Sequence, residues 1–352
     1  MKLTLRAIKS QIILLAFITV CLGLSACKKQ VPEELNLESA SESMVQNTTP
    51  DLNEICKKLK EEMLLISAKR TTFALEQINQ DIRLCLPLMT YKEQKHLIKL
   101  ADQMYDNFLE IDRTPEQQKS FNLYAYDQSQ FPTIQQAQFE KLHPRDQYLL
   151  THRGQAYIDL IDMDDQATYQ RNSYYLAKVF APYFPEAERE FMQELAEQNQ
   201  SVQFHDEHAE ISAQEIAERA LFWESYLKKF PKSSYLNDAK YLYHFYSNLL
   251  FKGLNHHPIS QHYESRSDIS PEALSAIEQM TNNEKSQLSN QARLFMQFIE
   301  LDTQQKNELI NIPQNANESN QDRIESQLHE YLNLKVLNLK HPRDCFTDAI
   351  CR

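Results

Sequence analysis

Four cysteines beyond residue 50 have positions from which their chemistry can be predicted. They are Cys56, Cys85, Cys345 and Cys351. Four thiols allow three pairings, but residues 51–68 and 72–85 are expected to form an antiparallel helix pair. In such a pair Cys56 and Cys85 lie about equally far from the turn and face each other, which leaves the other two to pair across a short loop. No Cys-x-x-Cys spacing occurs, so we expect two disulfides and no metal site.

Acidic residues and histidines form other groups that could bind metal ions. Three aspartates match the start of a calcium-binding loop: Asp162, Asp164 and Asp165. However, Ala167 stands where that loop requires glycine, and Ser173 stands where it requires glutamate. Five histidines form two groups: His205 with His208, and His256, His257 and His262. Neither group has the H-E-x-x-H spacing of zinc enzymes, so we expect loop histidines, no metal ion and no cofactor.

Glu224 is the first carboxylate to consider for catalysis. Glu224-Ser225 resembles the Glu-Ser pair of lytic transglycosylases, in which a glutamate of raised pKa protonates the glycosidic oxygen. The Gly-Leu-Met-Gln stretch of that family is missing downstream. The competing interpretation is an exposed glutamate on the polar face of a helix, and we predict no catalytic residue.

The tetrapeptide His-Pro-Arg-Asp occurs twice, at 143–146 and at 341–344. Proline is common at the first turn of a helix and just past its last turn. We therefore expect a helix boundary at each copy, with the arginine and aspartate pairing locally.

Glycine is scarce, because beyond the first 26 residues only Gly154 and Gly253 remain. Phosphate-binding loops, type I′ hairpin turns and the nucleophile elbows of hydrolases all depend on glycine. The sequence therefore excludes a P-loop, a Rossmann fingerprint and a G-x-S-x-G hydrolase, and it disfavours a β-rich fold.

Helix start signals recur along the chain. Three pairs have the capping-box spacing: Thr90 with Glu93, Ser212 with Glu215, and Thr281 with Glu284. Each pair is followed by apolar residues at helical spacing. Residues 302–322 are rich in Asn and Gln and are expected to form a loop before a last helix at about 323–339. These patterns predict an all-α fold built of helical hairpins.

The first residues of the chain predict secretion. Lys2, Arg6 and Lys9 form a positively charged start, and the apolar run 12–24 follows. This run is too short for a permanent membrane span, which needs about 20 residues. A charged start, a short apolar run and small residues at its end are typical of a secretory signal peptide.

The apolar run ends in Leu24-Ser25-Ala26-Cys27, which is similar to the lipobox of bacterial lipoproteins. The resemblance implies that 1–26 is removed and that Cys27 is lipidated, which anchors the protein to a membrane. Lys28 is not the aspartate that retains enteric lipoproteins at the inner membrane, so the periplasmic face of the outer membrane is the expected location. Residues 27–50 are polar and aperiodic and are expected to be a disordered tether.

The charge of the chain argues against nucleic acid as a partner. The net charge is −12 at pH 7, and removal of the basic signal makes the remainder more negative. A strongly acidic chain repels phosphate backbones. We therefore expect no nucleic-acid binding.

Residues 213–253 contain a recognisable helical unit. The turn Phe230-Pro231-Lys232-Ser233-Ser234 separates two apolar stripes, and Ala239 lies on the second stripe. This unit is similar to a helix pair of tetratricopeptide-like periplasmic proteins, notably the outer-membrane assembly lipoproteins and the cell-division coordinator associated with the Tol-Pal system. In those families the serine caps the second helix and the alanine allows close approach.

The domain organisation follows from these patterns. The resemblance implies a tetratricopeptide-like solenoid in the C-terminal half, at 209–352, and residues 51–200 are expected to form a separate N-terminal helical domain. The second helix of the unit is apolar around more of its circumference than one buried face requires, so some of its aromatic residues are candidates for binding a partner: Tyr235, Tyr241 and Phe245.

The predicted function is a non-catalytic scaffold or adaptor for a protein or peptide partner in the periplasm, active in envelope assembly or maintenance. Helical repeats build extended binding surfaces. The alternative is a cell-wall hydrolase, or a regulator of one, that uses Glu224.

Overall fold

Helix is the main secondary structure of the protein. The structure is a computed structural model. It describes residues 51–130, 136–163, 166–200, 204–205, 208–254, 257–283, 285–310, 312, 319–335 and 343–352. The predicted signal peptide, the predicted lipidation site Cys27 and the predicted tether lie outside these residues.

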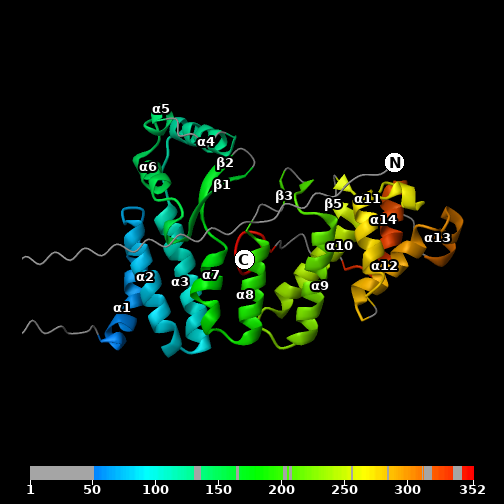
Figure 1. Ribbon diagram of the computed structural model, residues 1–352, viewed down its shortest axis with the longest axis horizontal. Helices are drawn as coiled ribbons and strands as arrows, with labels where there is room; N and C mark the ends of the chain where they lie inside the picture. Colours follow the sequence, from blue (N-terminus) through cyan, green and yellow to red (C-terminus); the bar gives the residue numbers. More distant parts are fainter. Residues whose placement is uncertain are drawn as a thin grey trace, which may run out of the picture. The chain divides into compact units, whose positions relative to one another are not determined.

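The described part of the chain contains fourteen α-helices and three short antiparallel strand pairs (Figure 1). The helices are α1 Leu52–Leu64, α2 Thr72–Cys85, α3 Tyr91–Leu109, α4 Pro115–Gln130, α5 Gln136–Phe139, α6 Pro144–Thr151, α7 Tyr174–Val179, α8 Glu186–Gln198, α9 Ala213–Lys229, α10 Leu236–Lys252, α11 Pro271–Met280, α12 Gln287–Phe298, α13 Thr303–Leu309 and α14 Asn320–Tyr331. The strands are β1 Ile158–Met163, β2 Gln166–Arg171, β3 Phe204–His205, β4 His208–Ala209, β5 Gly253–Leu254 and β6 His257–Pro258.

The N-terminal helix pair agrees with the prediction from the sequence. Helices α1 and α2 pack side by side in opposite directions (Figure 1), and the side chains of Asp51 and Thr71 cap their N-termini. Cys56 and Cys85 lie at disulfide distance, with their Cα atoms 5.5 Å apart. The predicted turn geometry therefore places the two cysteines opposite each other.

Helix α3 begins at the predicted capping box. The side chain of Thr90 accepts a hydrogen bond from the N–H of Glu93, and the Glu93 carboxylate accepts one from the N–H of Thr90. Four of the five apolar residues that follow at helical spacing are buried: Leu97, Ala101, Met104 and Phe108. The stripe therefore faces the core, as its periodicity predicts.

The β1–β2 hairpin is the main departure from the all-α prediction. Its register runs from Ile158 opposite Arg171 to Met163 opposite Gln166. Alternate residues of β2 are buried, among them Tyr169 and Arg171. This period of two is the pattern of a half-buried strand, but it extends over only six residues, and the scarcity of glycine argued against a hairpin.

Helices α9 and α10 form the predicted hairpin, although the turn is built differently. Ala239 is fully buried, which allows the two helices to approach closely. No side chain caps the start of α10, and Ser233 instead accepts the N–H of Tyr235 at 3.0 Å. The hydroxyls of Ser233 and Tyr226 lie 2.8 Å apart, so Ser233 links the hydroxyl of Tyr226 on α9 to the residue that precedes α10.

Three expectations for the C-terminal part are wrong. The last helix, expected at about 323–339, is α14, which spans Asn320–Tyr331. Thr281 lies at the C-terminal end of α11 instead of starting a helix, and α12 begins after the cap Ser286. The segment expected to be a loop contains α13, which starts at a capping box formed by Asp302 and Gln305. This box uses aspartate and glutamine in place of the Ser/Thr and Glu of the other boxes, and it lies in a segment whose many Asn and Gln residues resemble a loop.

The buried apolar residues form two clusters. The first cluster gathers residues of α1–α8 and the β1–β2 hairpin, and the second gathers residues of α8–α12 and α14. Helix α8 contributes Met192 and Ala196 to the first cluster, and Phe191 and Leu195 to the second. It is thus the shared wall between the clusters, and the predicted domain boundary near residue 200 follows directly after it.

Among the described residues, no helix has the length and apolar character needed to cross a bilayer.

Candidate functional site

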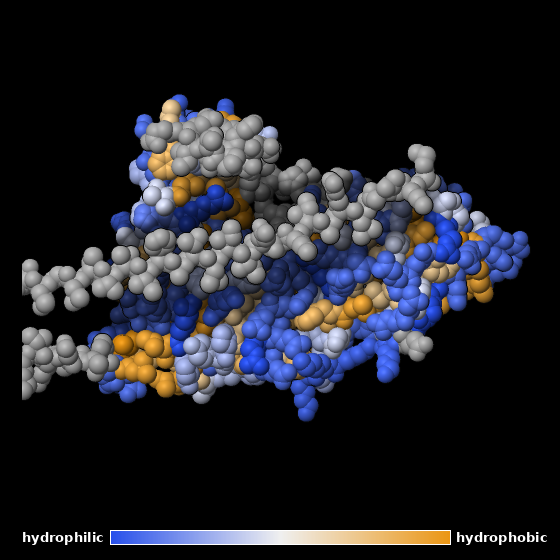
Figure 2. All heavy atoms as spheres, in the orientation of Figure 1, coloured by the Kyte–Doolittle hydropathy of each residue, from blue (hydrophilic) through white to orange (hydrophobic). Residues whose placement is uncertain are grey.

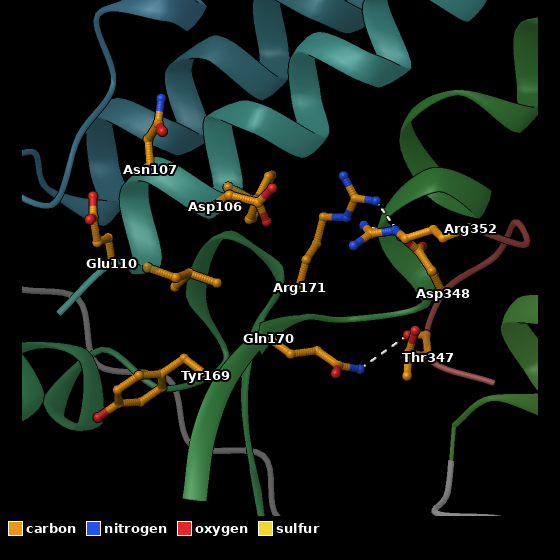
Figure 3. A pocket seen from close by; sticks show the side chains of 11 residues that line it. Asp106, Asn107, Glu110, Tyr169, Gln170, Arg171, Thr347, Asp348 and Arg352 are labelled. Atoms are coloured by element: carbon orange, nitrogen blue, oxygen red, sulfur yellow. Dashed lines mark hydrogen bonds and ion pairs between the residues drawn. The ribbon is translucent and has the colours of Figure 1, made fainter. Parts of the chain in front are cut away.

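A pocket of about 470 Å³ lies between α3, β2 and the C-terminal segment 343–352 (Figure 3). Its lining residues are Tyr105, Asp106, Asn107, Leu109, Glu110, Tyr169, Gln170, Arg171, Thr347, Asp348 and Arg352. The pocket is walled by three segments that are far apart in the sequence. We treat it as the candidate functional site because pockets with convergent polar groups are the usual ligand sites of proteins.

The C-terminal segment is closed on itself and fastened to the rest of the protein. Cys345 and Cys351 lie at disulfide distance, with Cα atoms 4.1 Å apart. The Asn199 side-chain amide donates to the carbonyl oxygens of Cys345 and Asp348, at 2.8 and 2.6 Å. Gln170 donates to the carbonyl of Thr347 at 3.0 Å. Both predicted cysteine pairs are therefore present, and the second one shapes a pocket wall.

An ion network joins the C-terminal segment to the floor of the pocket. Arg171 of β2 is buried, and its Nη2 contacts the carboxylates of Asp102, at 2.7 Å, and Asp348. The exposed Arg352 contacts Asp348 at 2.8 Å and Asp102 at 3.4 Å. Two arginines and two aspartates thus share one cluster, which Figure 3 shows in part at one end of the pocket.

The guanidinium of Arg171 also lies against aromatic rings. It is 4.7 Å from the ring centroid of Tyr175 and 5.4 Å from that of Tyr105. Its Nε and Nη1 atoms have no hydrogen-bond partner among the described residues, so the rings are their main favourable contact. Burial alone would lower the pKa of Arg171, but Asp348 and Asp102 outweigh burial and raise it, so the side chain stays charged.

The opposite side of the pocket is acidic. Asp106 of α3 and Glu110, which directly follows the end of α3, are both exposed, and Figure 3 places Glu110 on the side of the pocket away from the arginines. Neither carboxylate has an ion-pair partner in the part of the chain that the structure describes. The pocket therefore offers free acceptors on its α3 side and the donor Arg352 on its other side.

The pocket lining contains no nucleophile paired with a base. It has no histidine or cysteine, and the Thr347 hydroxyl donates to the carboxylate of Asp344 at 2.7 Å. Burial raises the pKa of Tyr169, which keeps that phenol protonated. The arrangement can hold a polar ligand through hydrogen bonds and charge.

Glu224 is neither exposed nor free, which corrects the sequence-based interpretation. Its carboxylate accepts hydrogen bonds from Ser286 Oγ at 2.5 Å and from the N–H of Gln287 at 2.7 Å. Lys228 Nζ donates to it at 2.5 Å. Burial alone would raise the pKa of Glu224, but these bonds outweigh burial and lower it. The residue thus caps the N-terminus of α12, and a lowered pKa is the opposite of what a general acid requires.

The three predicted partner-binding aromatics are half-buried. Tyr235 stacks on Phe191 of α8, with ring centroids 4.6 Å apart. Tyr241 stacks on Phe245 at 6.3 Å, and Phe245 lies 4.7 Å from Phe346 of the C-terminal segment. The segment thus shares the aromatic surface that the sequence had suggested for a partner.

The suspected metal ligands do not converge. Among the described residues there is no group of three or more His, Cys, Asp or Glu side chains that could hold a metal ion. Asp162 pairs with Ala167 in the β-hairpin, while Asp164, Asp165 and His256 lie outside the described residues. His205 and His208 belong to paired strands instead of one helix face.

The two His-Pro-Arg-Asp copies do not form local pairs. In the first copy Arg145 donates to the carbonyl oxygens of Arg70 and Phe108, each at 2.9 Å, and Asp146 accepts two bonds from Arg113. In the second copy Arg343 pairs with Asp238 of α10. Arg145, Asp146 and Arg343 therefore connect distant elements. Asp344 instead accepts hydrogen bonds from the nearby N–H of Phe346 and hydroxyl of Thr347.

Sequence reasoning missed the residues of the pocket. Arg171 lies in a strand that was not expected, and Asp348 carried no signal beyond its place between two cysteines. Comparisons with family models, with curated proteins and with solved structures found no match to this chain.

Proposed function

We propose that this protein is a lipoprotein held at the periplasmic face of the outer membrane, where it acts as a non-catalytic helical scaffold or adaptor for a protein or peptide partner. The location rests on the Leu24-to-Cys27 motif behind a basic start and a short apolar run. The polar residues that follow give the folded part reach from the membrane.

The pocket between α3, β2 and the C-terminal segment is the observation that carries the binding role. An extended peptide presents both N–H donors and carbonyl acceptors. Asp106 and Glu110 suit the donors, or a basic side chain, and Arg352 suits an acceptor or a carboxylate. The site therefore has the chemistry needed to recognise such a peptide.

The helical hairpins support the same function. Helical hairpins stacked in series build extended surfaces that bind peptides. The α9–α10 pair, with its buried Ala239, is consistent with the tetratricopeptide-like character that the sequence suggests for residues 209–352. We extend the proposal to a solenoid of this kind in the C-terminal half.

The alternative function is a cell-wall hydrolase or a regulator of one, and Glu224, its first candidate residue, is poorly suited to act as a general acid. All the hydrogen bonds described for Glu224 are made within the protein, and its pKa is lowered. A muramidase assay that compares the wild type with Glu224→Gln separates the two classes. Turnover that disappears in the variant would contradict the scaffold proposal.

In-cell photo-crosslinking tests the binding role. A photoreactive phenylalanine analogue at Glu110, on the pocket rim, should capture one reproducible protein partner. The same probe at Glu300, which is exposed on a different element, is the matched control. Equal capture at both positions would reject the pocket as the binding site.

Cell fractionation tests the anchor. The Cys27→Ser protein should leave the membrane fraction, whereas the wild type stays after a high-salt wash. A variant that remains bound would overturn the lipoprotein proposal.

A further inference from the structure

One exposed face of α2 carries no charged residue. Phe73, Gln77, Gln80 and Leu84 are spaced by three or four positions, so they lie along one side of the helix. Leu88 follows in the turn after the helix. Phe73 is 73% exposed, Leu84 51% and Leu88 59%. We call these five residues the α2 face.

Packing within the protein does not explain why the α2 face is apolar and uncharged. The core side of α2 is made by other residues, among them Leu75, Ile78 and Ile82. Single exposed apolar residues are common on soluble proteins. Here, however, a phenylalanine and two leucines share one stripe with two uncharged glutamines, in a chain of which 24% is charged. Such an uncharged stripe is typical of a contact surface.

The start of the folded part indicates what covers this stripe. Asp51 caps α1, and the Cys56–Cys85 pair holds the start of α1 against the end of α2. Leu52, which is 37% exposed, therefore lies at the same end as Leu84 and Leu88. Figure 2 shows apolar atoms gathered over this end of the α1–α2 pair.

The predicted anchor keeps this end near the membrane. If Cys27 is acylated, the chain from residue 27 to residue 51 connects the lipid to α1. A flexible chain of that length has a root-mean-square span of about 25–30 Å. The α2 face is thus never far from the bilayer, whereas a second copy of the protein must be met by diffusion.

Charge favours the same surface for membrane contact. The protein is acidic, so most of its surface is repelled by anionic headgroups. The α2 face lacks carboxylates, and phenylalanine and leucine are residues that enter the headgroup boundary.

We propose that the α2 face rests on the bilayer to which the lipid anchor holds the protein. The proposal depends on the lipoprotein function proposed above. It adds an orientation, because the anchor alone leaves the folded part free to turn.

Tryptophan reporters test this contact. The chain has one tryptophan, Trp223, which is fully buried and serves as a constant background. Acylated Leu84→Trp protein in phosphatidylcholine vesicles should be quenched at least twofold more by brominated acyl chains than acylated Leu309→Trp protein. Leu309 is 64% exposed on α13 and is the matched control. Phe73→Trp is a second reporter on the α2 face.

The outcomes separate this inference from the proposed function. Equal quenching of the Leu84→Trp and Leu309→Trp proteins, with both firmly anchored, overturns the α2 contact and leaves the lipoprotein proposal intact. Membrane retention of Cys27→Ser overturns the lipoprotein proposal itself. Photo-crosslinks between position 84 of two copies, without quenching, identify a second copy as the occupant and reject the bilayer.

Discussion

The two core clusters differ in how far apart in the sequence their stabilising contacts lie. The first cluster, built on α1–α8, depends on Asp348 and Ala349 from the far end of the chain, and Asp348 reaches Arg171 across 177 positions. In the second cluster the comparable polar contact, Glu224 with α12, spans 62 to 64 positions. The N-terminal region therefore depends on a segment from the far end of the chain. The C-terminal region is held by contacts between neighbouring helices as well as by this segment, which contributes Cys345 and Phe346.

This difference teaches that one short segment serves both regions. Cys345 is buried in the second cluster, and Ala349 is buried in the first. A change in the C-terminal segment should therefore affect residues that are remote from it in the sequence.

Asp348→Ala should cause the largest loss of stability. Arg171 is buried, and removal of one partner from a buried ion pair costs roughly 3–5 kcal/mol. Urea denaturation gives the total loss, and hydrogen exchange should locate it in the N-terminal region. Asp106→Ala is the control, because this exposed carboxylate has no described ion pair and should change stability by less than about 0.5 kcal/mol. Similar losses of stability in both variants would contradict the prediction that Asp348 stabilises the N-terminal region through Arg171.

The two cysteine pairs should differ in how much each contributes to the free energy of unfolding. The two cysteines are 29 positions apart in the Cys56–Cys85 pair and 6 positions apart in the Cys345–Cys351 pair. In the chain-entropy model the longer loop contributes roughly 3–4 kcal/mol and the shorter roughly 2 kcal/mol. We expect Cys56→Ser/Cys85→Ser to lower the free energy of unfolding more than Cys345→Ser/Cys351→Ser. The reverse order would mean that the C-terminal loop acts mainly through the contacts it positions.

Glu224→Gln should destabilise the C-terminal region by roughly 1–3 kcal/mol at pH 7. Because the folded state lowers the pKa of Glu224, its contribution is present above the unfolded pKa of about 4.3 and is lost as the pH falls through the folded pKa. The variant should therefore show a weaker loss of stability on acidification below about pH 4.5. If the stability of the wild type and of Glu224→Gln depends on pH in the same way, the charged Glu224 carboxylate does not stabilise the start of α12.

Helix caps should give the smallest effects. Thr90 takes part in a full capping box, whereas the side chain of Ser212 makes a single hydrogen bond, to the N–H of Glu215. Loss of a cap costs about 1 kcal/mol of stability. We expect Thr90→Ala to lower the free energy of unfolding more than Ser212→Ala does. Thermal unfolding followed by circular dichroism measures both, with an exposed Ser225→Ala as the control.

Much of the helical structure was predictable, because helix signals are local. Thr90 with Glu93 and the stripe that follows need only residues within a few turns of one another. The Cys56–Cys85 pair was predictable for the same reason, since a helix hairpin sets its geometry. The α13 start was missed because its box uses aspartate and glutamine.

The candidate site was not predictable, because its residues meet only through long-range packing. Arg171 lies in a strand of six residues, too short to give a strong pattern. Asp348 and Arg352 had no feature that indicated contact with β2. Glu224 was considered for its chemistry, and only the position of α12 turned it into a cap.

The sequence by itself predicted much of the helical structure, the caps Thr90 and Ser212 and the two cysteine pairs, because each depends on residue types at short spacing. Tertiary structure alone decided that Arg171 and Asp348 share a buried network, that the C-terminal segment walls a pocket, and that α2 keeps an uncharged outer face. Burial and pairing of charges depend on which surfaces meet, and that information is distributed over the whole chain rather than over any short stretch of it.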